Sequence, residues 1–387
     1  MSRKRVFHIG CLAVMLVLVS SCQTSSTATP IKPTPVLPLA FVDSGQDLGK
    51  GNGVSIDAGD VDGDGDMDVL IAMQDKDSTL WLNDGKGLFT QSQQRFPKCT
   101  NVALGDLNGD QLSDAVFTLG IINVVWMNDG KGNFIQSDQK LLSEESESLA
   151  LGDLDGDGDL DAYIPNWDGK PDQIFINDGK GNLTDSGQKL GNWSGTDVAL
   201  GDVDQDGDLD ALVANNGEEP TNEPVIWLND GKGYFTQSPQ KFGFSEASAV
   251  ALGDLDADGD LDAYIANSFH NKSNPVDTIW FNDGKGNFTN SGQKLGSAYG
   301  LSVELGDLDG DGDLDAYVGN WRFPPHIWLN DGKGYLSDST IMLKSSNNQG
   351  VTIADFDGDG DLDIFVASNN WSDTDGINRL WLNQIYP

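Results

Sequence analysis

The stretch DLDADGDLDAYIAN, residues 254–267, carries an aspartate at every second position for nine residues and then an apolar, partly β-branched run. It is followed by TIWFNDGKGNFTNSGQKL, residues 278–295, in which NDGKG separates two further apolar stretches. An Asn-Asp-Gly turn between short apolar runs is typical of a β-hairpin. Together with the apolar residues 250–252 that precede the aspartates, this part of the chain predicts four short strands.

This unit recurs along the chain. Seven acidic windows begin at Asp60, Asp106, Asp153, Asp202, Asp254, Asp307 and Asp355, at intervals of 46 to 53 residues. Internal repeats of about this period indicate a solenoid, a propeller or an array. Four short strands in a unit of about 50 residues favour the blade of a β-propeller.

The two ends of the repeat region distinguish a closed ring from an open array. After the seventh window come DIFVASN (363–369) and RLWLN (379–383), but no fourth strand. FVDSGQ (41–46), ahead of the first window, matches FTNSGQ (288–293) in register. A strand donated from the N-terminal side would complete the last blade and remove the exposed sheet edges, whereas a linear solenoid would need polar caps instead. We therefore predict an all-β fold in which residues 40–387 form one seven-bladed β-propeller of four-stranded blades.

Every predicted third strand carries an aromatic residue at the same register. Seven equivalent copies in mid-strand favour packing between blades over sugar stacking. The residues are Trp81, Trp126, Phe175, Trp227, Trp280, Trp328 and Trp381.

The N-terminal segment predicts export. Basic residues at positions 3–5 precede an apolar run, 6–19, that is too short to span a bilayer comfortably. The run ends in VSSC (19–22), which resembles the bacterial lipoprotein box, with an ordinary signal peptide as the alternative. We expect a lipoprotein signal peptide over residues 1–21, lipidation of Cys22, and a proline-rich tether over residues 22–39. The body would then be held by lipid to a bacterial membrane, on the cell surface or the periplasmic side.

Cysteine content excludes a disulfide framework. Cys11 would leave with the signal peptide and Cys22 would carry lipid, so Cys99 has no partner in the mature chain. Something other than disulfides must therefore supplement the core of this exported protein.

The charge balance argues against one large class of partner. The chain has 61 acidic and 23 basic residues and a formal net charge of −38, whereas nucleic-acid binding relies on lysine and arginine. A hydrophobic content of 38% and ten tryptophans indicate a packed core rather than disorder. Because more than half of the acid lies in the seven windows, it points to a local role for these segments.

We expect that role to be metal binding, because the alternative of hydrated acidic turns does not explain the constant spacing of the aspartates. With Asp254 as position 1, carboxylates stand at positions 1, 3, 5, 7 and 9, and Gly259 at position 6 permits a sharp turn. Ca²⁺ takes six to eight oxygen ligands in a flexible shell. Transition metals are disfavoured because the windows contain no histidine or cysteine, and Mg²⁺ suits such an all-protein cage less well. An EF-hand would need a glutamate at position 12, where this unit has Ile265.

These loops resemble the FG-GAP (VCBS-type) repeats of the integrin alpha-subunit propeller and its bacterial relatives. The resemblance covers residues 40–387 and implies up to seven Ca²⁺ ions, one in each loop between the first and second strands of a blade. It also implies side-chain ligands at positions 1, 3, 5 and 9 and a main-chain carbonyl ligand at position 7. The implied residues are Asp60, Asp62, Asp64, Asp66 and Asp68; Asp106, Asn108, Asp110, Leu112 and Asp114; Asp153, Asp155, Asp157, Asp159 and Asp161; Asp202, Asp204, Asp206, Asp208 and Asp210; Asp254, Asp256, Asp258, Asp260 and Asp262; Asp307, Asp309, Asp311, Asp313 and Asp315; and Asp355, Asp357, Asp359, Asp361 and Asp363.

The second loop departs from this pattern. Gln111 replaces glycine at position 6, and Leu112 occupies position 7. A main-chain ligand tolerates leucine, but glutamine resists a backbone angle that glycine adopts freely. We expect this loop to be the weakest of the seven sites.

The face opposite the predicted metal loops is the candidate ligand face, because its connections vary in length and chemistry. Its aromatic and polar residues either bind a carbohydrate or protein ligand or cover the ends of the blades. They are Trp167, Trp193, Phe269, His270, Tyr299, Trp321, Arg322 and Trp371.

Catalysis has little support, because no GxSxG, HExxH or phosphate-binding glycine motif is present. The sequence favours a non-catalytic, monomeric recognition or adhesion module. The alternative is an enzyme, a lyase or hydrolase, that acts on extracellular polysaccharide on the same scaffold.

Overall fold

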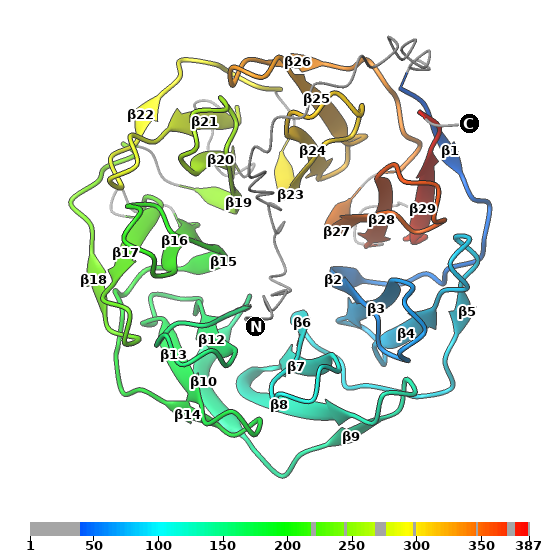
Figure 1. Cartoon of the computed structure of the whole chain (residues 1–387), viewed down its shortest axis with the longest axis horizontal. Helices are drawn as coiled ribbons and strands as arrows, with labels where there is room; N and C mark the ends of the chain where they lie inside the picture. The colour runs from blue at the N-terminus through cyan, green and yellow to red at the C-terminus, as the bar shows by residue number, and fades with distance from the viewer. Residues whose placement is uncertain are drawn as a thin grey trace, which may run out of the picture.

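A computed structural model describes residues 39–217, 222–243, 246–267, 276–296, 299–345, 347–369 and 376–385. Within these residues the secondary structure is entirely β, and the strands form seven antiparallel sheets arranged as a ring (Figure 1). The predicted seven-bladed β-propeller is therefore confirmed. No apolar helix long enough to span a bilayer occurs in this part of the chain.

Six blades follow one another in chain order from the first acidic window. Blade 1 contains β2 (Gly53–Gly59), β3 (Asp68–Met73), β4 (Thr79–Leu82) and β5 (Thr90–Gln91); blade 2 contains β6 (Asn101–Gly105), β7 (Asp114–Thr118), β8 (Gly120–Asn128), β9 (Phe134–Gln136) and β10 (Leu141–Ser146); blade 3 contains β11 (Ala150–Gly152), β12 (Asp161–Ile164), β13 (Gln173–Asn177) and β14 (Leu183–Asp185). Blade 4 contains β15 (Gly195–Gly201), β16 (Asp210–Asn215), β17 (Val225–Asn229) and β18 (Phe235–Gln237); blade 5 contains β19 (Ala247–Gly253), β20 (Asp262–Asn267), β21 (Thr278–Phe281) and β22 (Thr289–Asn290); blade 6 contains β23 (Gly300–Gly306), β24 (Asp315–Asn320), β25 (His326–Asn330) and β26 (Leu336–Asp338).

Blade 7 combines the two ends of the ring. It contains β27 (Asn348–Ala354), β28 (Asp363–Ser368) and β29 (Arg379–Asn383), and β1 (Phe41–Asp43) is its fourth strand. β1 pairs antiparallel with β29, Phe41 opposite Asn383. Gln46, just after β1, donates to the carbonyl of Gly87 in blade 1 at 2.6 Å. The predicted closure is confirmed.

The core lies between neighbouring blades. The third-strand aromatics pack there: Trp328 of blade 6 lies in one buried cluster with Tyr264 and Ile279 of blade 5. Blades also approach closely near the ring axis, where a Cβ on Gly152 at the end of β11 would lie 2.8 Å from Leu209 of blade 4. The predicted role of the aromatic register in packing between blades is confirmed.

Blade 2 has a feature that the repeat pattern did not predict. A turn at Gly120, with φ of 88°, joins β7 directly to β8, which runs for nine residues. The added length of β8 pairs with a fifth strand, β10, with Leu142 opposite Ile122. Both of these side chains remain exposed.

Candidate metal loops and ligand face

The seven acidic loops all connect the first and second strands of their blades, so they share one face of the ring with the NDGKG turns. Position 6 has a left-handed backbone: φ is 97° at Gly65 in the first loop. Gln111 in the second loop adopts the same region, with φ of 71°, which is strained for a residue with a side chain. Position 4 is left-handed as well, and Gln205 and Ala257 occupy it in the fourth and fifth loops.

The carboxylate at position 1 shapes the loop. In the first loop, Asp60 Oδ1 accepts from the N–H of Gly63 at 2.7 Å, and Asp60 Oδ2 accepts from the N–H of Gly65 at 3.0 Å. Asp153 and Asp355 make the same pair of hydrogen bonds in their own loops. These bonds turn the backbone around the aspartates that follow.

The carboxylate at position 9 is buried at the base of the loop. Asp68 accepts from the N–H of Val61 at 3.0 Å and from the N–H of Asn83 at 2.8 Å. Burial raises the pKa of Asp68 to about 7, despite these two bonds. The pKa of Asp114, at the same position in the second loop, rises to about 6 for the same reason. A nearby cation would offset the cost of keeping these groups ionised.

The loops bring several predicted ligands together. In the first, third and fifth loops, ligand oxygens from positions 1, 3 and 9 lie within 4.8 Å of one another; in the fourth and sixth, those from positions 1, 3 and 5 do. The carboxylate at position 7 lies elsewhere, against the NDGKG turn: a Cβ on Gly85 would come 2.5 Å from the Asp66 oxygens.

The position 3 carboxylates carry the strongest sign of a cation. Among the described residues, the buried Oδ1 atoms of Asp62, Asp204 and Asp256 have no hydrogen-bond partner. Burial, and next the neighbouring carboxylates of Asp64 and Asp60, raise the pKa of Asp62. Inward, unsatisfied carboxylate oxygens in an all-oxygen loop fit a hard divalent cation such as Ca²⁺.

The asparagine of NDGKG was not predicted to have a structural role, yet it links neighbouring blades. Asn83 Nδ2 donates to the carbonyl of Met67 in its own loop at 3.2 Å and to that of Phe356, position 2 of the blade 7 loop, at 2.8 Å. The contact to the preceding loop is repeated in every blade, and in blade 7 it is made by Asn383, which is not part of an NDGKG turn: Asn128 to Val61, Asn177 to Leu107, Asn229 to Leu154, Asn282 to Val203, Asn330 to Leu255 and Asn383 to Leu308. Each acidic loop is thus bonded to the next blade.

On the opposite face, the predicted ligand residues separate into two groups. Trp193 packs against Trp227 with ring centroids 6.0 Å apart, so it covers the end of its blade. Trp167 is half-buried, and its N–H donates to the carbonyl of Glu145 at 2.9 Å. Three further candidates, Phe269, His270 and Trp371, lie outside the described residues.

The other candidates gather on blade 6. Tyr299 lies 6.3 Å from Trp321 and 6.1 Å from Phe323, measured between ring centroids. The guanidinium of Arg322 stands 4.4 Å over the Trp321 ring. The main-chain N–H of Trp321 donates to the main-chain carbonyl of Tyr299 at 2.8 Å. This bond links the two connections that carry these side chains.

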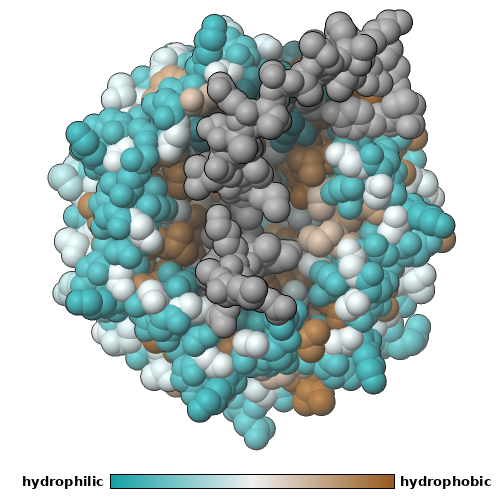
Figure 2. Space-filling model, viewed as in Figure 1, coloured by the Kyte–Doolittle hydropathy of each residue, from teal (hydrophilic) through white to brown (hydrophobic). Residues whose placement is uncertain are grey.

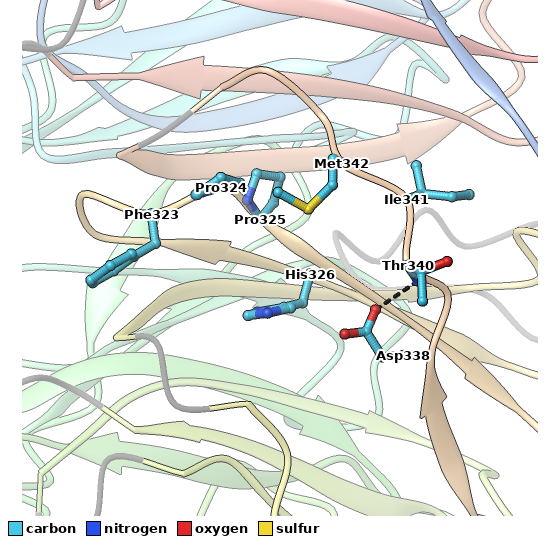
Figure 3. Close-up of a pocket in the computed structure, with 8 residues that line it drawn as sticks. All are labelled: Phe323, Pro324, Pro325, His326, Asp338, Thr340, Ile341 and Met342. Atoms are coloured by element: carbon cyan, nitrogen blue, oxygen red, sulfur yellow. Dashed lines mark hydrogen bonds between the residues drawn. The ribbon is translucent and has the colours of Figure 1, made fainter.

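Beside this cluster lies a cavity of about 400 Å³, here called the blade 6 pocket. Its walls come from the β24–β25 connection, the start of β25, the end of β26 and the segment that follows β26 (Figure 3). It is lined by Phe323, Pro324, Pro325, His326, Asp338, Thr340, Ile341 and Met342.

In the view of Figure 1, hydrophilic residues cover most of the surface, with hydrophobic residues in small groups between them (Figure 2).

The chain belongs to the FG-GAP-like repeat family, as its acidic loops indicated. The family model matches residues 60–117, 153–213, 202–265, 254–318 and 320–366. A comparison with curated proteins found no match.

Solved structures share the fold. BBS1N, in its complex with ARL6DN, has a TM-score of 0.60 and 9% sequence identity, covering 91% of this chain and 98% of its own. A lectin of Agrocybe aegerita that recognises non-reducing terminal N-acetylglucosamine has a TM-score of 0.51 and 17% identity, covering 87% of each chain. At these identities the likeness is one of fold.

Proposed function

We propose that this protein is a non-catalytic recognition or adhesion module: an exported, lipid-anchored propeller that binds Ca²⁺ in its loops and a carbohydrate or protein ligand on the opposite face. The observation that carries the recognition role is the blade 6 cluster of Tyr299, Trp321, Arg322 and Phe323. Phe323 is 47% exposed, although an aromatic ring is usually buried. Aromatic and arginine side chains are enriched where proteins bind ligands.

The two structural neighbours support a binding role by analogy of fold alone, since one is in complex with a protein and the other recognises a sugar. Calcium is supported by the orphaned oxygens at position 3 and by the charge that crowds each loop. Ions bound in the seven loops would stabilise a ring that has no disulfide framework, because they bind only the folded state.

The anchor is supported by the sequence VSSC at 19–22 and by the proline-rich segment that follows it. Its test is metabolic labelling with a fatty acid in a bacterial host. The wild-type protein should take up label and partition into the membrane fraction, and the Cys22→Ala variant should do neither. Equal labelling of both proteins would contradict the anchor.

The recognition role is tested with the calcium-loaded protein on a glycan array and in a pull-down from extracellular proteins, alongside a polysaccharide-cleavage screen. Retention of a defined glycan or protein without cleavage products is expected. Turnover of a polysaccharide would instead make the protein an enzyme.

A further inference from the structure

We propose that the blade 6 pocket is a sugar-binding site. In it, one pyranose ring of a glycan lies against Phe323 and places neighbouring hydroxyls between His326 and Asp338. This inference rests on the proposed recognition function and assigns a site and a ligand class to it.

The pocket offers a hydrogen-bond acceptor. Asp338 Oδ1 accepts from the N–H of Thr340 at 2.7 Å, which fixes the carboxylate in place (Figure 3). Asp338 is exposed on the pocket wall, so its carboxylate is accessible to a ligand. A carboxylate held in this way suits a sugar hydroxyl, because hydrogen bonds to charged groups are stronger than neutral ones.

The pocket also offers a donor. Asn320 Nδ2 donates to the carbonyl of Pro324 at 2.9 Å and lies 3.1 Å from His326 Nδ1. Because an amide nitrogen can only donate, Nδ1 accepts, and the proton of the neutral ring sits on Nε2. The histidine ring is held by stacking on Trp328, with centroids 5.3 Å apart. Because His326 and Asp338 both line the pocket, it presents a donor and an acceptor to the hydroxyls of a sugar.

The backbone around the pocket is held in place. Arg322 and Thr340 have positive φ angles of 63° and 61°, which are unfavourable for residues with side chains. The N–H of Arg322 donates to the side chain of Asn347, which links the two connections that form the walls. Such strain persists only where the surrounding structure enforces it, so the walls are preorganised.

The shape favours a sugar ring over a peptide side chain. Phe323 remains 47% exposed and Met342 73% exposed, so the pocket is open and shallow. A peptide anchor binds best in a deep, fully desolvated pocket, whereas a sugar ring stacks on an exposed aromatic face. The volume of about 400 Å³ is at the small end of the range for ligand pockets, which suits one terminal unit of a larger glycan.

The test uses the full, calcium-loaded protein on an array of mono- and oligosaccharides, followed by calorimetric titration with the best-retained glycan. Phe323→Ala and Asp338→Asn are the test variants; asparagine can still accept from Thr340, so the fold is preserved. Tyr335→Ala, at an aromatic residue that is 62% exposed and directly follows an NDGKG turn, is the matched control. Each test variant should weaken binding roughly tenfold or more, and the control should bind as wild type does.

Two results would overturn the inference, and both leave the recognition role open. One is an array that retains no glycan at millimolar concentration, after which a protein ligand would remain for the pull-down to find. The other is undiminished glycan binding by both test variants at unchanged melting temperature, which would move the site to another blade.

Discussion

On the face of the acidic loops, the third strand of every blade ends in an asparagine or is followed directly by one, and this asparagine bonds to the preceding loop. On the opposite face, the residue five positions earlier is not constant, and four residue types occupy this position. It is Ser78, Asn123, Asp172, Pro224, Asp277, Pro325 and Asn378 in blades 1 to 7.

Several of these residues meet the same local need with different chemistry. Asp172 and Asp277 accept from the N–H groups of Asn166 and Asn267. Asn378 accepts from the N–H of Ser368. The face of the acidic loops thus repeats one contact between blades, whereas the opposite face varies among the blades. This difference supports the proposal that the first face holds the blades together and that the second carries the ligand site.

Removal of metal should lower the stability more than any single substitution, because every blade has an acidic loop. We expect a chelator to lower the melting temperature by roughly 10 °C or more, since each occupied site adds about 2.7 kcal/mol at a hundredfold excess over Kd. Differential scanning calorimetry measures this, and added Ca²⁺ should restore the wild-type melt. An unchanged melt after verified metal removal would contradict it.

Substitution of the asparagine that links neighbouring blades should lower the free energy of unfolding by the same amount in each blade. Asn83→Ala, Asn229→Ala and Asn282→Ala each remove two hydrogen bonds to buried carbonyls, which should cost about 2–3 kcal/mol. Urea denaturation should give the three variants equal losses. A spread of more than about 1 kcal/mol among them would show that the joints are not equivalent.

On the opposite face, the effect of a substitution on stability should depend on the blade and on pH. Burial raises the pKa of Asp277 from 3.8 to about 7, so the folded state holds a proton that the unfolded state releases. Stability is therefore lost as pH rises from about 4 through about 7. Asp277→Asn introduces the residue that blades 2 and 7 have at this position. The variant should not show this loss of stability and should be about 2 kcal/mol more stable than wild type at pH 8.

Melts of wild type and Asp277→Asn between pH 5 and pH 8, in saturating Ca²⁺, check this prediction. Asp172→Asn should behave alike, because burial raises the pKa of Asp172 to about 7 as well. Parallel pH curves for wild type and both variants would refute it.

The smallest effect should come from the second loop. Gln111→Gly relieves a left-handed backbone and should add up to about 1 kcal/mol of stability while tightening Ca²⁺ binding at that loop. The reverse change, Gly65→Gln, should weaken the first loop. Site-resolved Ca²⁺ titration tests both, and a wild-type second loop that binds most tightly would contradict the account.

The architecture could be predicted because the sequence repeats. The seven windows, the hairpin turns and the displaced strand at Phe41 each have a local signature, and seven copies reinforced one another. The deviation in blade 2 lacked such a signature, because a single short turn at Gly120 extends β8 and lets β10 pair with it.

The joints between blades were less predictable. Asn229 bonds to Leu154, 75 residues earlier, and no local pattern reveals a contact that depends on how blades pack. The left-handed backbone at position 4 was also not predicted. Most loops have glycine there, which adopts this conformation freely, whereas Gln205 and Ala257 adopt it under strain. The blade 6 pocket was not predicted. Trp321 and Arg322 of the neighbouring cluster were identified from their loop, whereas His326 and Asp338 come together in the pocket only in three dimensions.

The most direct test of cation-stabilised assembly is the number of Ca²⁺ ions bound per chain, measured by calorimetric titration of the metal-free protein. The account predicts seven ions, six bound with similar affinity and one, in the second loop, bound more weakly. A folded ring that takes up no Ca²⁺ would contradict it.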